Sequence, residues 1–350
     1  MLKHISGLNG IRAIAVLMVI VSHRFPIDHF LRIMPIGHFG VDIFFVLSGY
    51  LISRILLNGI SKIEHNSATP YQLIKSFVIR RSLRIFPIYY LLLLVLYLTG
   101  GIIGNSFREN FLWYFFYGSN YLIYTEGKWF GCLAHLWSLA VEEQFYLVWP
   151  FLVLVLFRNR ILILLLVTIL IGTLSPFFID GITYVLTISC INAFGIGALL
   201  AYVELKRPQW QSVFIKTINV LAVVSLSLIF VHYFVYEFAL FSDRLLVSII
   251  AVALIAYCRY HQKSYLVTHI LENKMLSFIG LISYGVYLYH NIIPRYWIVV
   301  LKRLHIETPA TVGNFSYAEF FIQTAFVIFI SYLSWILIEK PIGKWKDKIS

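Results

Sequence analysis

The stretch Ile161-Leu-Ile-Leu-Leu-Leu-Val-Thr-Ile-Leu-Ile171 decides the class of fold, because it is apolar and carries no charge. A longer apolar block runs from Val213 to Val235. At a rise of about 1.5 Å per helical residue, such blocks cross or nearly cross a hydrocarbon core roughly 30 Å thick. Of the 350 residues, 60% are hydrophobic and 13% are charged, whereas soluble chains are roughly 45–50% apolar and about 25% charged. The chain is therefore a polytopic membrane protein, which excludes a secreted mini-protein, a cytosolic enzyme and a transcription factor.

The net charge of +12 comes from 28 Lys and Arg residues against 16 Asp and Glu residues. In a soluble protein this excess would suggest nucleic acid, but the cytoplasmic loops of membrane proteins are rich in Lys and Arg. We therefore expect no nucleic-acid partner. Cys132, Cys190 and Cys258 lie far apart, and neither they nor the histidines show the spacing of a zinc site. We expect no metal and no disulfide framework.

Hydropathy and helix length predict an all-α fold of about ten transmembrane helices in a single domain, 1–350. The first span contains Arg12 and His23 without a cleavage site, which indicates a retained helix rather than a signal peptide. The aromatic stretch from Phe111 to Tyr124 is expected to be an interfacial or re-entrant helix. The expected spans are 9–27, 37–57, 82–104, 136–157, 161–179, 184–203, 213–234, 243–260, 276–296 and 316–338.

The charges of the loops predict the orientation of these spans. With both termini in the cytoplasm, 20 of the 28 basic residues fall on the cytoplasmic side and eight fall outside. This division follows the positive-inside rule and favours an even number of crossings.

Ionisable residues within the spans are candidates for function, because each costs several kcal/mol in lipid. Arg12 and His23 are eleven residues apart on the first span, close to three helical turns, so they share one stripe about 16 Å apart. Asp42, Glu142 and Glu143 are expected at the same outer depth as His23, where they could form an acid–base constellation. Because neighbouring residues point about 100° apart on a helix, both glutamates should not serve one group. The alternative is a structural hydrogen-bond cluster.

On the cytoplasmic side, Arg81 and Arg84 are three residues apart and lie side by side on the third helix. With Arg12 they would form a cluster of guanidinium groups, which suits phosphate. The alternative is lipid-headgroup binding and determination of topology. Near the outer end of the ninth span, Tyr284 and His290 could line an acceptor pocket.

Several stretches, in order along the chain, resemble the acyltransferase-3 family of membrane O-acyltransferases. The region from Trp137 to Tyr146 is the most specific of them. One departure is Asn9, where many members carry Asp. The stretches are Leu8-Asn9-Gly10-Ile11-Arg12 followed by His23, Gly40 to Ile52, Arg81-x-x-Arg84, Trp137 to Tyr146, Ser283-Tyr284 to His290, and Glu339-Lys340-Pro341.

This resemblance implies transfer of an acyl group, usually acetyl from acetyl-CoA, to a hydroxyl of a cell-envelope saccharide. It also implies a bundle of roughly ten helices in the bacterial inner membrane. The expected acceptors are O-antigen, lipopolysaccharide, exopolysaccharide or a lipid-linked precursor, and the other partners are acyl-CoA and membrane lipids. Some members carry an extra periplasmic domain, for which this chain is expected to be too short.

The candidate residues fall into three groups. The expected catalytic residues are His23, which the resemblance implies, with Asp42, Glu142 and Glu143, although the resemblance assigns the glutamates no role. The residues that the resemblance implies at the acyl donor are Arg12, Arg81 and Arg84. The residues expected at the acceptor are Trp137, Ser138, Tyr284 and His290.

Together these residues suggest a conduit with guanidinium groups at its inner mouth and the His23 imidazole further out. His23 would act either as general base or as a covalent acyl carrier. A proton-coupled transporter or flippase for lipid-linked sugars is the alternative, because buried carboxylates can relay protons. A purely structural membrane protein would leave the charges within the spans unexplained.

Overall fold

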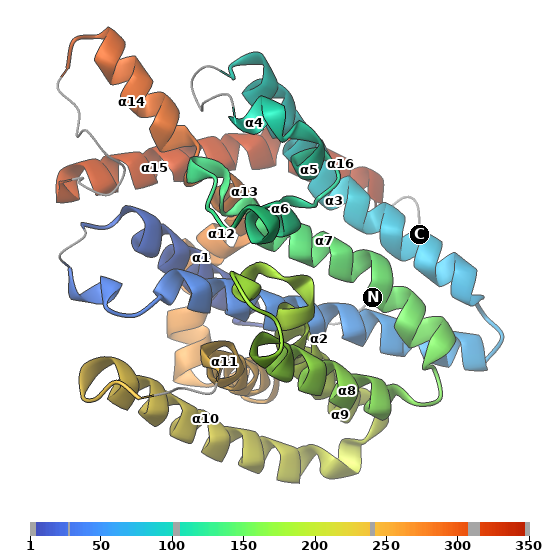
Figure 1. The fold of residues 1–350 in the computed structure, drawn as a ribbon. Helices are drawn as coiled ribbons and strands as arrows, with labels where there is room; N and C mark the ends of the chain where they lie inside the picture. The colour runs from blue at the N-terminus through green and yellow to red at the C-terminus, as the bar shows by residue number, and fades with distance from the viewer. Residues whose placement is uncertain (1–4, 27–28, 101–105, 239–241, 307–315, 347–350) are drawn as a thin grey trace.

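The computed structural model describes residues 5–26, 29–100, 106–238, 242–306 and 316–346, and within these ranges it contains helices and no strand (Figure 1). Short 3-10 or π-helical turns extend several of the helices. The α-helices are α1 Leu8–Arg24, α2 Ile36–Glu64, α3 Pro70–Leu98, α4 Ser106–Glu109, α5 Phe111–Phe115, α6 Ser119–Glu126, α7 Leu136–Phe151, α8 Ile161–Leu174, α9 Thr187–Lys206, α10 Gln211–Phe234, α11 Asp243–Tyr260, α12 Lys274–Leu281, α13 Ser283–Tyr289, α14 Ile293–Arg303, α15 Tyr317–Ser334 and α16 Lys340–Lys346.

The prediction of an all-helical polytopic membrane protein is confirmed. In the described ranges, six helical segments are long and apolar enough to cross a membrane. The expected count of ten is not confirmed, because α1, α8 and α11 are shorter or carry charged ends. The six segments are Ile36–Glu64, Pro70–Leu98, Gly131–Leu156, Thr187–Lys206, Pro208–Phe234 and Tyr317–Lys344.

The structure adds detail to two of the predicted segments. The ninth span, expected as one helix over 276–296, is divided between α12, α13 and the start of α14. The last break follows from Pro294 in the first turn of α14, since proline has no N–H to donate to the preceding turn. The stretch from Phe111 to Tyr124 forms the two short helices α5 and α6, neither long enough to cross, as predicted for a helix that does not span the bilayer.

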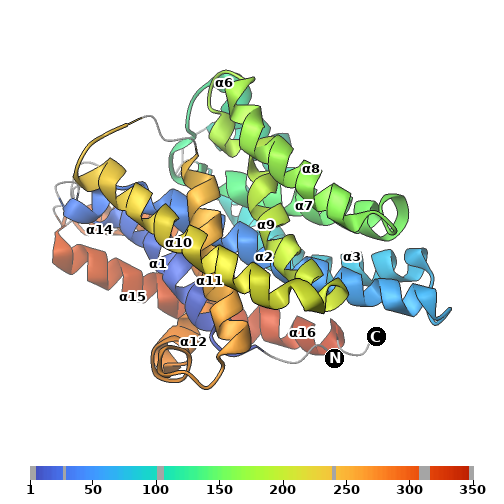
Figure 2. The ribbon, with the colours of Figure 1, turned by 90° about the horizontal axis from the view of Figure 1, so that it is seen from below.

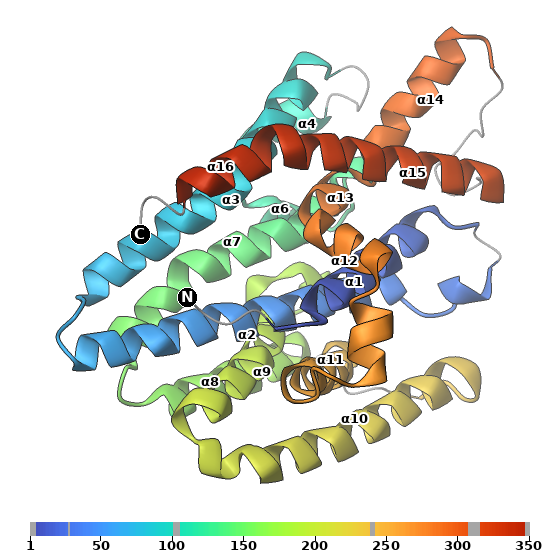
Figure 3. The same ribbon diagram turned by 180° about the vertical axis from the view of Figure 1, so that it is seen from behind.

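The helix α2 is the centre of the bundle and packs against α1, α9 and α11 (Figures 1 and 3). On the other side, α7 lies between α2 and α3, and α15 and α16 pass behind α3. The helix α10 lies at the edge, over α11 (Figure 2). From Val220 onward its outward side chains are mostly apolar, with Val220 64% exposed and Val223 67% exposed. A helix that is apolar on its outward face as well as its inward face belongs in lipid.

Two glycines bring α2 and α9 into backbone contact. A Cβ atom on Gly49 would lie 2.1 Å from the carbonyl oxygen of Phe194, and one on Gly197 would lie 2.1 Å from that of Val46. Small residues at such crossings allow close van der Waals packing of helices inside a membrane. The contact fixes the face that α2 turns toward α1 and α7, where the candidate site lies.

Candidate active site

A cavity lies between α1, α2, α3, α7 and α13, and it contains most of the predicted polar residues. Its volume is about 90 Å³, roughly that of three water molecules. The charged residues in its wall come from three helices: Arg12 from α1, Arg81 and Arg84 from α3, and Glu142 and Glu143 from α7. The other lining residues are Val41, Phe44, Phe45, Leu47, Ser48, Leu51, Ile85, Ser138, Leu139, Tyr146, Ser283, Tyr284 and Tyr287.

The three arginines meet as predicted. Arg12 is close enough to Arg81 and Arg84 for their charges to interact. Its Nη1 donates to Oδ1 of Asn9 at 3.3 Å, and the Arg81 guanidinium carbon lies 5.1 Å from the centroid of the Tyr146 ring. Within the described ranges, no ion pair of 4.0 Å or less joins any of these three arginines to a carboxylate. Three guanidinium groups thus share the cavity with two carboxylates, Glu142 and Glu143, whose charges act on them without a direct ion pair.

The two glutamates of α7 face the same cavity, although their helical positions suggested that they would diverge. The Ser48 hydroxyl donates to Oε1 of Glu142 at 2.7 Å, and it lies 3.0 Å from the Tyr146 hydroxyl. Glu143 is 6% exposed, and its Oε1 has no hydrogen-bond partner among the residues described. The cavity thus contains one carboxylate held by hydroxyl groups and a second, less constrained one.

His23 lies in the last turn of α1 and is exposed. It does not line the cavity. Its ring centroid lies 5.3 Å from that of His290, which in turn lies 4.7 Å from the ring of His135. His135 and His290 are 2% and 0% exposed. The structure therefore places the candidate catalytic imidazole at the outer end of a row of three histidine rings.

The wall between the cavity and this row is formed by Tyr287 and Ser138. Their hydroxyl groups lie 2.5 Å apart, and both residues line the cavity. The Tyr287 hydroxyl also donates to the carbonyl oxygen of His135 at 3.1 Å. Tyr287 thus lies between the cavity and the two buried histidines, with its ring centroid 5.8 Å from that of His135 and 5.5 Å from that of His290.

Asp42 does not join the constellation predicted for it. It is 1% exposed and forms an ion pair with Arg244 of α11, whose Nε donates to Asp42 Oδ1 at 2.7 Å. Arg244 also donates to the carbonyl oxygens of Ser189 at 2.6 Å and Tyr184 at 2.8 Å. The pair faces α11 and does not line the cavity. The expected grouping of Asp42 with the two glutamates is therefore wrong, and its catalytic role has no support from the geometry.

The predicted acceptor residues are divided. Ser138 and Tyr284 line the cavity, and the Tyr284 hydroxyl donates to the carbonyl oxygen of Ile85 at 3.2 Å. Trp137 does not line it, because its ring packs toward Tyr184 on the far side of α7, with centroids 5.3 Å apart. His290 lies beyond the wall, next to His23.

Sequence reasoning missed Ser48, Tyr146 and Tyr287 as cavity residues. Tyr146 lies four residues after Glu142, so helical periodicity could have placed both on one face. Tyr287 lies three residues after Tyr284, so the same periodicity could have placed it at the cavity, where the structure brings it. No group of three or more His, Cys, Asp or Glu residues that could hold a metal ion occurs in the part of the chain that the structure describes.

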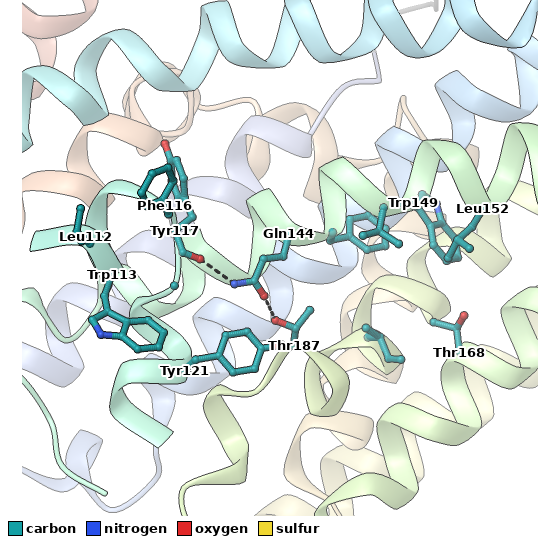
Figure 4. A pocket seen from close by; sticks show the side chains of 14 residues that line it. Leu112, Trp113, Phe116, Tyr117, Tyr121, Gln144, Trp149, Leu152, Thr168 and Thr187 are labelled. Carbon is teal, nitrogen blue, oxygen red and sulfur yellow. Dashed lines mark hydrogen bonds between the residues drawn. The ribbon is translucent and has the colours of Figure 1, made fainter. Parts of the chain in front are cut away.

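A second hollow of about 840 Å³ lies on the opposite face of α7, between α5, α6, α8 and α9 (Figure 4). Its walls are mostly apolar and aromatic, including Trp113, Tyr121 and Trp149. The polar group at its base is Gln144, which donates to the carbonyl oxygen of Tyr117 at 2.8 Å and accepts a hydrogen bond from the Thr187 hydroxyl. This hollow faces away from the arginines and contains no charged residue.

Comparison with known proteins relates this chain to a family of acyltransferases. The sequence profile of a family described as an acyltransferase domain matches residues 5–339. The chain is 33% identical to peptidoglycan O-acetyltransferase OatA of Listeria monocytogenes, over 98% of this chain and 56% of the relative. It is 30% identical to YrhL of Bacillus subtilis, provisionally named a peptidoglycan O-acetyltransferase, over 97% of this chain and 55% of the relative.

The chain spans little more than half the length of these curated relatives. No solved structure matches it. The family profile covers nearly the whole chain, including the arginines and glutamates of the cavity and the three histidines beyond its wall. The chain therefore belongs to the acyltransferase-3 family of membrane O-acyltransferases.

Proposed function

We propose that this protein transfers an acyl group, most simply acetyl, from acetyl-CoA to a hydroxyl of a cell-envelope saccharide. One observation carries the proposal: Arg12, Arg81 and Arg84 meet in a cavity within the helix bundle without an ion-pair partner in the described ranges. Guanidinium groups bind phosphate through charge-assisted and often bidentate hydrogen bonds. An anionic, phosphate-bearing donor would neutralise these charges, and coenzyme A has such phosphates.

The chemistry needs a base near the acceptor and a path for the thioester. His23 and Arg12 are eleven residues apart on α1, which is about 16 Å along the helix. An extended pantetheine arm could cover this distance from phosphates held at the arginines. His23, exposed at the outer end, is placed to meet an acceptor that arrives from the opposite side.

In the direct route, His23 removes the proton from the acceptor hydroxyl while its oxygen forms a bond to the acyl carbon. The thioester C–S bond breaks, and the proton passes from His23 to the thiolate, which gives the ester and free coenzyme A. In the two-step route, a His23 nitrogen attacks the thioester and the C–S bond breaks to release coenzyme A. The acceptor oxygen then bonds to the acyl carbon, the bond from that carbon to His23 breaks, and the imidazole takes the hydroxyl proton. Ping-pong kinetics would indicate the second route.

Either route requires the wall of Tyr287 and Ser138 to move. A cavity of about 90 Å³ is well below the roughly 300–1,000 Å³ of ligand pockets. The hydroxyl pair at 2.5 Å would have to separate for the acyl group to reach His23.

The names of the relatives guide the choice of acceptor. Because two of them are named for peptidoglycan, peptidoglycan and its lipid-linked precursor are the first acceptors to test. The bacterial cytoplasmic membrane is the matching location, since acetyl-CoA is made on one side and the saccharide lies on the other. A transporter is less well supported, because a proton relay through carboxylates does not need three unpaired guanidinium groups.

The experiment uses purified protein in lipid vesicles, with release of free thiol from acetyl-CoA and mass spectrometry of the saccharide as readouts. We expect thiol release that depends on the acceptor, and acetylated product. His23→Ala should abolish both at unchanged expression. His65→Ala is the control, because His65 is an exposed histidine in the turn after α2. Full activity of His23→Ala would refute the role of His23, and no transfer by the wild type to any envelope saccharide would refute the function.

A further inference from the structure

A second imidazole lies directly behind His23. His290, at the end of α13, is 0% exposed, and its ring plane is tilted by 45° to that of His23. Its Nδ1 lies 2.6 Å from the backbone carbonyl oxygen of Tyr287. Because a carbonyl oxygen can only accept a hydrogen bond, the proton of His290 is on Nδ1 and Nε2 carries a lone pair.

This Nε2 atom is buried and has no hydrogen-bond partner among the residues that the structure describes. A buried polar atom without a hydrogen-bond partner is destabilising, so a partner is expected. The His23 ring centroid lies 5.3 Å from that of His290, and no hydrogen bond joins the two rings in this arrangement. Since ring nitrogens lie roughly 1 Å from their centroid, a nitrogen of each ring can approach to about 3 Å, a hydrogen-bonding distance.

We propose that His290 is a positioning residue for His23. The Nε2 atom of His290 accepts a hydrogen bond from one ring N–H of His23, and this bond fixes the tautomer and the orientation of the His23 ring. The other nitrogen of His23 then presents its lone pair to the acceptor hydroxyl. In histidines generally, the partner of one ring nitrogen decides the state of the other. The inference rests on the proposed function, in which His23 is the reacting imidazole.

His135 supports His290 from behind. Its Nε2 donates to the carbonyl oxygen of Leu288 at 3.2 Å, and its ring meets that of His290 at 70°. Neither His135 nor His290 forms an ion pair with a carboxylate of the described ranges. Backbone carbonyls of α13 thus orient both buried rings, and the orienting group for His23 is a neutral imidazole rather than the carboxylate more usual beside a functional histidine.

Two substitutions at one position separate positioning from packing. His290→Phe keeps an aromatic ring but offers no acceptor, and we expect kcat to fall roughly tenfold or more with little change in the KM for acetyl-CoA. In His290→Gln, the amide oxygen can take the place of Nε2, and we expect partial recovery of kcat. Tyr289→Phe is the control, because it removes a neighbouring buried hydrogen bond, to Ser334 at 3.0 Å. An inactive wild type would refute the proposed function; an active wild type with unchanged kcat in His290→Phe would refute the positioning role alone.

A measurement on the wild type does not depend on activity or on folding of a variant. In ¹⁵N-histidine-labelled protein in lipid nanodiscs, we expect His23 to show a single neutral tautomer and a scalar coupling across the N–H···N bond to His290 Nε2. Two exchanging tautomers of His23, or a coupling between Nε2 of His290 and a different donor, would overturn the proposal.

Discussion

Arg84 is one of several basic residues of α3, and only some of these residues line the cavity. Arg84 lines the cavity with Arg12 and Arg81, whereas the basic side chains at the start of α3 do not. The sequence pattern was sufficient to group the three arginines, because their spacing along each helix decides the face they occupy. It was not sufficient for Asp42, because its partner Arg244 lies 202 residues away in the chain. Only the packing of α2 against α11 brings the two together.

Reversing the charge of Arg84 should weaken binding of the donor. We expect Arg84→Glu to raise the KM for acetyl-CoA by roughly tenfold or more, since a charge-assisted contact becomes a repulsion. Lys75→Glu is the matched control, because Lys75 is an exposed cation of the same helix that does not line the cavity. Steady-state kinetics with varied acetyl-CoA give the answer, and an unchanged KM in Arg84→Glu would contradict a phosphate site at these arginines.

Removing the charge of Asp42 should reduce stability rather than chemistry. Asp42→Asn leaves the buried Arg244 guanidinium without its counter-charge, and loss of one partner of a buried pair costs about 3–5 kcal/mol. We expect a lower melting temperature in detergent and a near-normal kcat for each folded molecule. Asp180→Asn, at an exposed carboxylate, should change neither quantity. A large loss of kcat at an unchanged melting temperature would instead return Asp42 to the catalytic group.

Hydropathy predicted where helical segments lie along the chain. It did not predict where a helix is interrupted. The predicted spans over 37–57 and 213–234 fall within α2 and α10. The span over 276–296 is broken in the structure. Hydropathy did not predict this break, because a local interruption of the backbone leaves the average hydropathy of the segment unchanged. The close approach of α2 and α9 depends on Gly49 and Gly197, which a hydropathy profile treats as weakly polar residues rather than as contacts.

A side chain at Gly49 should separate α2 from α9. We expect Gly49→Val to lower the melting temperature and the yield of folded protein, because its Cβ would lie 2.1 Å from a backbone oxygen that cannot move independently. Gly343→Val in α16 is the control, because a Cβ at Gly343 meets nothing within 4 Å. Equal melting temperatures for the two variants would contradict the contact described between α2 and α9.

For the molecule as a whole, the proposed chemistry requires the arginines to open toward the cytoplasm. The loop charges predict that Ser67, after α2, is cytoplasmic and that Glu126, at the end of α6, is outside. Both residues are exposed. The orientation is predicted from the distribution of Lys and Arg alone.

Cysteine labelling tests this orientation. In a background without Cys132, Cys190 and Cys258, a membrane-impermeant maleimide should label Ser67→Cys only in inverted vesicles. It should label Glu126→Cys only in right-side-out vesicles. The reverse pattern would turn the arginines away from the supply of acetyl-CoA and would contradict the proposed reaction.

The small cavity and the contact between Tyr287 and Ser138 bear on how a membrane that contains this protein keeps its proton gradient. A protein that joins two compartments through polar side chains could dissipate the proton-motive force if water formed an unbroken file through it. The hydroxyl groups of Tyr287 and Ser138, 2.5 Å apart, leave no room for water between these two side chains of the cavity wall. We therefore expect this contact to part only during turnover, so that the proposed transfer across the bilayer leaves no standing file of water.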